Sequence, residues 1–146
     1  MRLLIINGPN LNMLGIREPE LYGHQTLADI EAMVRQRCAE HGVVPTFFQS
    51  NHEGALVDAI QQAYGQQDGI IINPAAYTHT SVAILDALKA VALPAVEVHL
   101  SDPLVREPFR HHSFITSVCI AAIRGKGAAG YVEAVDMLVR HLATKS

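Results

Sequence analysis

Short, nearly continuous apolar runs alternate along this chain with longer segments whose apolar residues recur at helical spacing. The runs predict strands at 2–7, 43–49, 69–73, 94–100 and 117–123. The periodic segments predict helices at 26–41, 53–66, 79–91 and 129–143. Strands this apolar are typical of a parallel sheet that helices cover on both faces. The pattern therefore predicts an α/β fold with a flavodoxin-like, doubly wound, five-stranded parallel sheet of order 2-1-3-4-5 in three α/β/α layers.

Local signals mark the ends of the first predicted helix and a turn near the end of the fourth strand. Thr26 with Asp29 three residues later is typical of a helix start, and Gly42 is typical of the residue after a helix end. Asp102-Pro103 predicts a short helical turn before a loop that runs through Arg110.

Length and composition indicate one domain over residues 1–146. Hydrophobic residues make up 49% and charged residues 17%, which supports a packed core and argues against disorder. The net charge is -3 and the basic residues do not cluster, so no nucleic-acid or membrane partner is expected. No apolar run approaches the roughly 20 residues of a membrane span, and Gly8-Pro9 interrupts the apolar start. We therefore expect a cytoplasmic protein.

The cysteines and histidines lack the spacing of a metal site. Cys38 lies in a helical pattern and Cys119 in an apolar strand, and we interpret both as reduced core residues. His111 and His112 are adjacent, which does not suit two ligands of one ion, and no HExxH-type spacing occurs. No metal is expected.

Polar residues gather where the predicted strands end. Asn7 through Asn12 follow the first strand, Asn73 ends the third, and His99 and Ser101 stand at the end of the fourth. Open α/β sheets bind ligands beyond the carboxyl ends of their strands. The sequence therefore predicts a ligand site at this edge of the sheet.

The connection over residues 8–25 is unusually long for a compact domain. It carries three glycines and two prolines together with Asn10, Asn12, Arg17, Glu18 and Tyr22. A loop of this length without secondary structure is usually functional, so we interpret it as a lid over the site. The alternative is a surface loop with no role in function.

Glu97 and His99 are two residues apart on an apolar strand, and their side chains therefore point to the same face. Burying such a pair costs free energy unless the two groups are bonded to each other. One interpretation is a satisfied buried ion pair. The position at a carboxyl end favours the other, in which Glu97 orients His99 as a general acid.

Tyr22 is a candidate base, and the alternative is a surface phenol in the loop. A free phenol has a pKa near 10, so about one part in a thousand is ionised at neutral pH. An ionised form near pH 7 requires roughly 4 kcal/mol of preferential stabilisation. Arg17 in the same loop is the obvious source of the positive charge, and Arg110 is a second available cation.

The predicted helix at 79–91 carries more apolar surface than one buried face requires. We expect the larger side chains to face the sheet, namely those of Val82, Leu85 and Leu88. A second stripe holds the small residues Ala83, Ala87 and Ala90, with Asp86 beside it. A helix that is apolar nearly all round is buried nearly all round, so a subunit interface near Asp86 is predicted. The alternative is a monomer with Asp86 in solvent.

Residues 125–130 (GKGAAG) match the G-x-G-x-x-G pattern of dinucleotide-binding loops. They follow the last predicted strand, so no later strand can complete the βαβ unit or supply its ribose-binding acid. We interpret them as a tight strand-to-helix turn and reject NAD binding.

Several motifs together resemble the type II 3-dehydroquinate dehydratases, in order and over essentially the whole chain. They are residues 7–15 (NGPNLNMLG), 17–19 (REP), 22–23 (YG), 49–54 (QSNHEG), 72–81 (INPAAYTHTS), 97–101 (EVHLS), 106–107 (RE) and 109–113 (FRHHS). The resemblance implies that the chain removes water from 3-dehydroquinate to give 3-dehydroshikimate, by anti elimination through an enol(ate), in the shikimate pathway of aromatic amino-acid biosynthesis.

The resemblance also implies catalytic roles. Tyr22 as tyrosinate would remove a proton from the carbon next to the ketone, and Asn10 would hold a water that stabilises the enol(ate). His99 would protonate the departing hydroxyl while Glu97 positions it. Arg17 would close over the site and promote ionisation of Tyr22.

The same resemblance implies the binding residues. Asn73 and the Leu100-Ser101 segment would bind the substrate carboxylate, and His79 and Arg110 would hold ring hydroxyls. One departure from the family pattern lies here, because 101–104 reads Ser-Asp-Pro-Leu in place of Ser-Asn-x-His. It changes the charge and loop shape beside the carboxylate pocket.

The family forms dodecamers of four trimers, so the resemblance implies such a homododecamer, with Asp86 reaching a neighbouring subunit's site. It implies no cofactor and no metal. No lysine occupies a site position, which argues against the Schiff-base chemistry of the unrelated type I enzymes.

Two alternatives remain on the same fold: a signalling or flavin-binding module, and an inactive scaffold. A phosphoacceptor receiver needs acidic residues where this chain has Asn7 and Asn73, and a flavin phosphate loop needs a Ser/Thr-rich turn where it has residues 8–11 (GPNL). An inactive scaffold is the other alternative, and the presence of every mapped catalytic residue argues against it.

Overall fold

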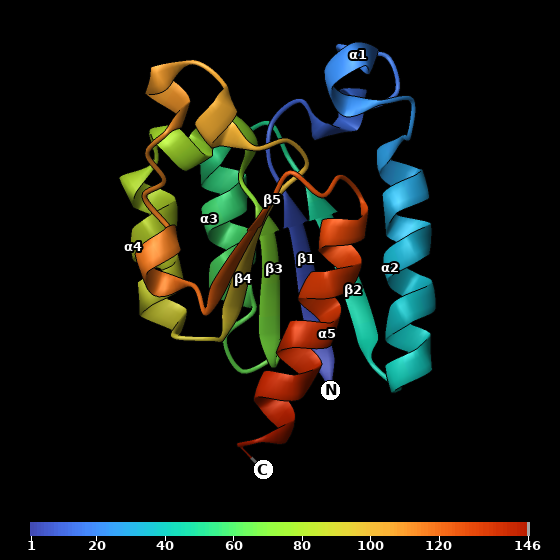
Figure 1. Cartoon of the computed structure of the whole chain (residues 1–146). Coiled ribbons are helices and arrows are strands. Elements are labelled where there is room, and N and C mark those ends of the chain that lie inside the picture. Colours follow the sequence, from blue (N-terminus) through green and yellow to red (C-terminus); the bar gives the residue numbers. More distant parts are fainter. Residues whose placement is uncertain (146) are drawn as a thin grey trace.

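Parallel pairing brings the carboxyl ends of the strands to one edge of a single sheet (Figure 1). The structure is a computed structural model that describes residues 1–145; Ser146 and the side chain of Tyr22 lie outside the described residues. The strands are β1 (Arg2–Asn7), β2 (Val44–Gln49), β3 (Gly69–Asn73), β4 (Ala95–His99) and β5 (Ala121–Arg124). Their order is β2-β1-β3-β4-β5, which confirms the predicted topology.

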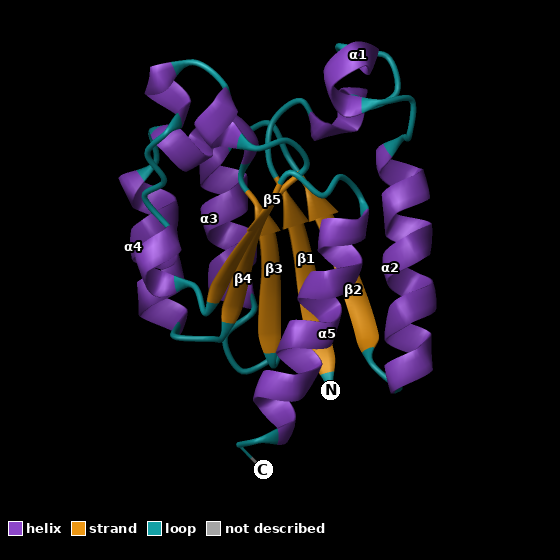
Figure 2. Cartoon of the chain, in the orientation of Figure 1, coloured by secondary structure: helices purple, strands orange, loops and turns teal. Residues whose placement is uncertain are grey.

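Helices cover both faces of this sheet (Figure 2). They are α2 (Leu27–His41) and α5 (Ala129–Ala143) on one face, and α3 (Glu53–Gln62) and α4 (Val82–Val91) on the other. Alternating residues of β1 show the division, because Leu3 and Ile5 pack with α2 and α5, whereas Leu4 and Ile6 pack with α3 and α4. Side chains of a strand point alternately to its two faces, so each strand supplies both cores.

Short helical turns connect the larger elements at the carboxyl edge. They are η1 (Leu11–Met13), α1 (Pro19–Tyr22), η2 (Ala75–His79), η3 (Pro103–Val105), η4 (Pro108–Arg110) and η5 (Thr116–Val118). The turn predicted at Asp102-Pro103 is η3, which begins with the Asp102 carboxylate accepting from the Leu104 amide at 3.0 Å. Among the described residues, no helix is both long and apolar enough to span a membrane.

The predicted ends of the first long helix are confirmed. The Thr26 hydroxyl accepts from the Asp29 amide at 3.1 Å, and the Asp29 carboxylate accepts from the Thr26 amide at 3.0 Å. This reciprocal capping box satisfies two amides at the helix start, and such a cap typically contributes about 1 kcal/mol. At the other end Gly42 has φ +69°, a left-handed conformation that glycine adopts without strain.

Three predicted boundaries were wrong. The helix predicted at 53–66 ends at Gln62, and residues 63–66 form a turn. The helix predicted at 79–91 begins at Val82, because the Ser81 hydroxyl caps it by accepting from the Ile84 amide at 2.9 Å. His79 therefore belongs to the preceding turn η2. The strand predicted at 117–123 begins at Ala121, opposite Val96 of β4, because η5 occupies the preceding residues.

The assignment of faces on α4 was also partly wrong. Its buried residues follow the spacing of one helix face and are Ile84, Ala87, Leu88 and Val91. Val82, predicted to face the sheet, is 50% exposed, and Leu85 is only half-buried. Ala87, predicted for the outer stripe, is buried. The outer stripe therefore consists of exposed Val82, Ala83, Asp86 and Ala90.

Both cysteines are free thiols. Cys38 is buried in α2 as predicted, and burial raises the pKa of its thiol to about 11. Cys119 precedes β5, which corrects its predicted place in the strand, and burial together with the Glu97 charge raises the pKa of its thiol to about 12. Thiols this weakly acidic are poor nucleophiles at neutral pH.

Candidate active site

A pocket of about 510 Å³, part of it open to solvent, lies beyond the carboxyl ends of the strands. Three chain segments line it: the loop after β1, the turn after β3, and the end of β4 with the loop that follows. Eight of the predicted site residues lie in its wall, namely Asn10, Arg17, Asn73, His79, His99, Leu100, Ser101 and Arg110. The pocket occupies the edge of the sheet where the sequence predicted a ligand site.

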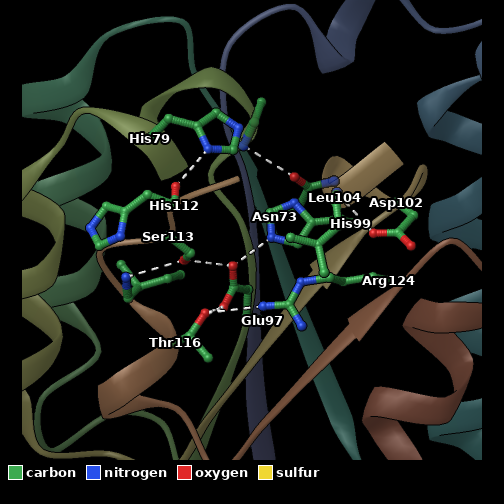
Figure 3. A network of polar contacts seen from close by, with 12 residues as sticks. Asn73, His79, Glu97, His99, Asp102, Leu104, His112, Ser113, Thr116 and Arg124 are labelled. Atoms are coloured by element: carbon green, nitrogen blue, oxygen red, sulfur yellow. Dashed lines mark hydrogen bonds and ion pairs between the residues drawn. The ribbon is translucent and has the colours of Figure 1, made fainter. Parts of the chain in front are cut away.

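A buried pair, Glu97 and His99, stands at the end of β4 beneath this pocket (Figure 3). Glu97 Oε2 lies 2.5 Å from His99 Nε2, and the two side chains share a face because they are two residues apart on the strand. Glu97 is fully buried and His99 is 6% exposed. Because Nε2 faces the carboxylate, Nδ1 is the ring nitrogen that remains for a group in the pocket.

Three donors surround the Glu97 carboxylate. Besides His99, the Ser113 hydroxyl donates to Oε2 at 2.8 Å and the Thr116 hydroxyl donates to Oε1 at 2.5 Å. Arg124, the neighbour of His99 on β5, donates in turn to the Thr116 hydroxyl at 3.3 Å. Burial alone raises the pKa of Glu97, but the hydrogen bonds from His99, Thr116 and Ser113 together hold that pKa below its ordinary value. The carboxylate is therefore ionised at neutral pH.

His79 has a defined tautomer. Its Nδ1 lies 2.8 Å from the carbonyl oxygen of His112, which can only accept, so Nδ1 carries the proton. Burial, aided by the positive charges of His99 and Arg110, holds the pKa of His79 below its ordinary value despite that hydrogen bond. At neutral pH the ring is uncharged, and Nε2 is left to accept a hydrogen bond from a ligand hydroxyl.

Asn73 ends β3 directly beside Asn7 of β1 and is 3% exposed. Its Oδ1 accepts from the Ala75 amide at 3.1 Å, and its Nδ2 donates to the Tyr131 hydroxyl at 3.0 Å. An amide nitrogen has two hydrogens, so one remains for a ligand in the pocket.

Cations make the pocket suited to an anionic ligand. Arg17, Arg106 and Arg110 all line it. Arg106 Nη1 lies 3.5 Å from the Ser101 hydroxyl, and Arg110 Nε lies 2.6 Å from the Glu107 carboxylate. Guanidinium groups recognise carboxylates through paired donors, so the wall around Ser101 can bind one.

The loop after β1 is tied to the sheet at its first residues. The Gly8 amide donates to the Asn73 carbonyl at 2.8 Å, and a side chain at Gly8 would collide with the Pro74 carbonyl. Asn10 has φ +68° and donates its amide to Asn51 Oδ1 at 3.0 Å. Asparagine tolerates this left-handed conformation better than most residues, and it places the exposed Asn10 at the pocket rim.

Among the predicted site residues whose side chains the structure describes, Asp86 lies away from the pocket. Asp86 is exposed on the outer face of α4 and is absent from the pocket lining. The backbone of Tyr22 ends α1 in the predicted lid, and its side chain lies outside the described residues.

Some residues of the site were missed by sequence reasoning. Arg106 and Ser113 lie in matched motifs but were assigned no role, and Thr116 and Arg124 carried no signal at all. Ser113 and Thr116 meet Glu97 across 16 and 19 positions of the chain, so only the fold reveals those contacts. Within the described part of the chain, no three His, Cys, Asp or Glu side chains group in a way that could hold a metal ion.

Comparison with known proteins gives consistent matches. A family model described as dehydroquinase class II matches residues 1–139. A 3-dehydroquinate dehydratase 1 of Corynebacterium efficiens is 55% identical over 96% of this chain and 93% of that protein. A catabolic 3-dehydroquinase of Penicillium rubens is 58% identical over 92% of this chain and 86% of that protein. The crystal structure of a type II dehydroquinase from Butyrivibrio crossotus has a TM-score of 0.92 and 48% identity, covering 94% of this chain and 97% of that chain. These matches confirm the family resemblance drawn from the sequence.

Proposed function

We infer that this chain, which belongs to the class II dehydroquinase family, is a hydro-lyase. It converts 3-dehydroquinate into 3-dehydroshikimate and water in the shikimate pathway. The observation that carries the proposal is the buried Glu97–His99 pair at the floor of a pocket that arginines surround. This arrangement joins a proton donor for a leaving hydroxyl to a binding site for an anionic substrate.

Two sets of pocket residues suit the carboxylate and the hydroxyls of the substrate. Asn73 Nδ2 and the Leu100-Ser101 segment bind the carboxylate, and Arg106 beside Ser101 adds positive charge. His79 accepts from a ring hydroxyl through Nε2, and Arg110 donates to another. Fixing the carboxylate and the hydroxyls sets the distances from the reacting carbons to the base and to the acid.

Tyr22 in the lid supplies the base for the first step. As tyrosinate it takes a proton from the carbon next to the ketone, and the electron pair left behind forms an enol(ate). A water held by Asn10 stabilises the developing oxyanion with a hydrogen bond. Arg17 lines the pocket from the same loop and supplies the positive charge that favours the tyrosinate.

His99 completes the elimination. The enol(ate) electron pair forms the carbon–carbon double bond while the carbon–oxygen bond breaks, and the departing hydroxyl takes a proton from His99 to leave as water. The ionised Glu97 carboxylate accepts from His99 Nε2 and fixes the ring, so that Nδ1 faces the departing hydroxyl. Tyr22 then releases the abstracted proton to solvent and His99 takes up a proton from solvent, which restores the resting enzyme.

The assembled enzyme is proposed to be a dodecamer of four trimers that works in the cytoplasm. The exposed stripe on α4, with Val82, Ala83 and Ala90 around Asp86, supports a subunit contact there. Asp86 is exposed and does not line its own pocket, so its proposed role is in the site of a neighbouring subunit.

The experiment that tests the function follows the ultraviolet absorbance of the conjugated product as 3-dehydroquinate is added. The wild-type enzyme should turn over, and Tyr22→Phe and His99→Ala should each lose at least about a hundredfold in kcat because each lacks a proton-transfer group. Tyr64→Phe, which removes an exposed phenol hydroxyl just after the end of α3, should keep the wild-type kcat. Substantial kcat retained by Tyr22→Phe would rule out the proposed base.

A second arm tests the electrostatic role of Arg17. Arg17→Gln removes the positive charge from the lid, so the limb of the kcat/KM profile that reports the base should move to higher pH. A profile that drops in height without moving would show that Arg17 only binds the substrate.

A further inference from the structure

The turn between β5 and α5 contacts the wall of the pocket from behind. The Gly125 amide donates to the Ser101 carbonyl at 3.1 Å, and the Gly127 amide donates to the Leu100 carbonyl at 3.0 Å. Both acceptors belong to the segment proposed to bind the substrate carboxylate. The contact is between backbones, so it constrains the peptide planes of that segment directly.

These bonds determine which way the facing amides point. In a trans peptide the N–H is directed opposite to the preceding carbonyl. The Leu100 carbonyl is held toward Gly127, so the Ser101 amide is directed the other way, and Ser101 lines the pocket. A backbone amide aimed at a pocket in this way is a donor for an anion.

The glycines are needed for this turn. Gly125 has φ +75° and Gly127 has φ +59°, conformations that side chains rarely adopt. A Cβ on Gly125 would also approach the Asp102 Cβ to 3.3 Å. The G-x-G-x-x-G pattern thus has a physical purpose in this chain that does not involve a nucleotide.

Tyr131, in the first turn of α5, reaches the same subsite from the other side. It is fully buried, its hydroxyl accepts from Asn73 Nδ2 at 3.0 Å, and it donates to Asn7 Oδ1 at 2.6 Å. The Ala75 amide can only donate, so the Asn73 atom facing it is Oδ1. Nδ2 is thereby placed against Tyr131, and its second hydrogen is directed elsewhere.

Tyr131 is not itself a base in the reaction. Burial raises the pKa of its hydroxyl far above the ordinary value, although the hydrogen bond from Asn73 opposes that rise. The phenol remains protonated, and its single proton is already given to Asn7. Its effect on the pocket passes through Asn73.

We propose that residues 125–131 (GKGAAGY) form a positioning element for the carboxylate subsite, with the two glycine amides orienting the Leu100-Ser101 backbone and Tyr131 orienting the Asn73 amide. The inference rests on the proposed function. In this proposal, a segment that does not touch the substrate determines how strongly the pocket prefers a carboxylate over a neutral group.

Tyr131→Phe tests this element because it removes only the hydroxyl and keeps the ring. Asn73 then loses the acceptor that holds its Nδ2, so KM for 3-dehydroquinate should rise about tenfold, with kcat changed much less. The preference in kcat/KM for 3-dehydroquinate over its carboxamide should fall by a similar factor. This ratio is the decisive readout, since general loosening of the fold would not move it.

Leu138→Ala is the matched control. Leu138 is fully buried on the same helix, two turns beyond Tyr131, and the substitution weakens the packing of α5 without touching the hydroxyl. It should lower the melting temperature and leave the acid-to-amide ratio unchanged. An equal loss of that ratio in Leu138→Ala would overturn the proposal.

Gly127→Ala provides an independent arm if Tyr131→Phe folds poorly. It strains the turn at a positive φ and should give the same loss of carboxylate preference, whereas Gly54→Ala on α3, where a Cβ meets nothing, should not. If the wild type is active but the acid-to-amide ratio of kcat/KM is unchanged in both Tyr131→Phe and Gly127→Ala, only the positioning element is refuted. An inactive wild type would refute the proposed function instead.

Discussion

The Glu97 carboxylate lies 2.5 Å from His99 Nε2, and no ligand in the pocket can reach that nitrogen without displacing it. Ser113 and Thr116 satisfy the rest of the carboxylate. The pair is therefore a closed unit that presents one ring atom, His99 Nδ1, to the pocket. A proton delivered to a substrate from this unit leaves through Nδ1.

Replacing Glu97 by Gln should lower kcat strongly and change KM little. The amide removes the negative charge that offsets an imidazolium, and a neutral imidazole is a far weaker acid toward a leaving hydroxyl than an imidazolium. A kcat loss of about a hundredfold or more is expected, as for other general acids deprived of their orienting group. The measurement is steady-state turnover of 3-dehydroquinate.

Glu40→Gln is the control for that substitution. Its carboxylate pairs with Arg37 on the surface of α2 at 2.9 Å, so turnover should stay at the wild-type rate. Adding His99→Ala to Glu97→Gln should cost little beyond His99→Ala alone, because the two residues act as a unit. Fully additive losses would contradict that coupling.

Thr116→Val should shift the pH dependence of both stability and activity. The pKa of Glu97 lies below its ordinary value, so the stability gained from this carboxylate is present above that ordinary value of 4.5 and is lost as pH falls through the lowered pKa. Without the Thr116 donor the pKa of Glu97 rises. The loss of stability on acidification then begins at a higher pH. The acid limb of the kcat profile should therefore move to higher pH.

The measurement for Thr116→Val is denaturant unfolding and kcat across the acid range. Thr144→Val removes a hydroxyl that donates to the His141 carbonyl at the end of α5 and should leave both profiles in place. Thr116→Val with an unmoved acid limb would show that the Thr116 donor does not govern the charge of Glu97.

His79 should titrate below the ordinary histidine value of 6.5. Because the folded pKa is lowered, the unfolded chain binds more protons between the two values, and stability rises as pH increases through that window. Nuclear magnetic resonance of labelled imidazoles measures both the midpoint and the tautomer, with the signal assigned by its loss in His79→Gln. A proton on Nε2 in the neutral ring would refute the proposed acceptor role.

Asp86 can be tested by mixing subunits. Asp86→Ala and His99→Ala should each be weakly active alone, because each lacks one residue from every site. Refolded together, mixed oligomers should regain activity at about a quarter of their sites, where an intact His99 meets a neighbour's intact Asp86. Mixtures no more active than their parents would place Asp86 outside its neighbour's site, and light scattering would report whether the subunits assemble.

Helices and strands that are determined by short stretches of sequence were predicted well. Each strand core is an apolar run, and the first helix is bounded by the Thr26–Asp29 box and Gly42. The start of β5 was predicted too early because the residues before it are as apolar as a strand, and only the place of Ala121 opposite Val96 decides where pairing begins. Val82 was misplaced because packing against the sheet buries the face with Ile84 and Leu88, which leaves Val82 on the opposite face.

Alone, the sequence determined the order of elements, the edge that holds the pocket, and the Glu97–His99 pair, because strand periodicity is local and fixes which residues share a face. Tertiary structure decided what surrounds that pair. Ser113, Thr116 and Tyr131 meet their partners across 16, 19 and 58 positions of the chain. No periodic pattern in the sequence predicts such contacts, because they depend on how separate elements pack and not on the spacing within any one element.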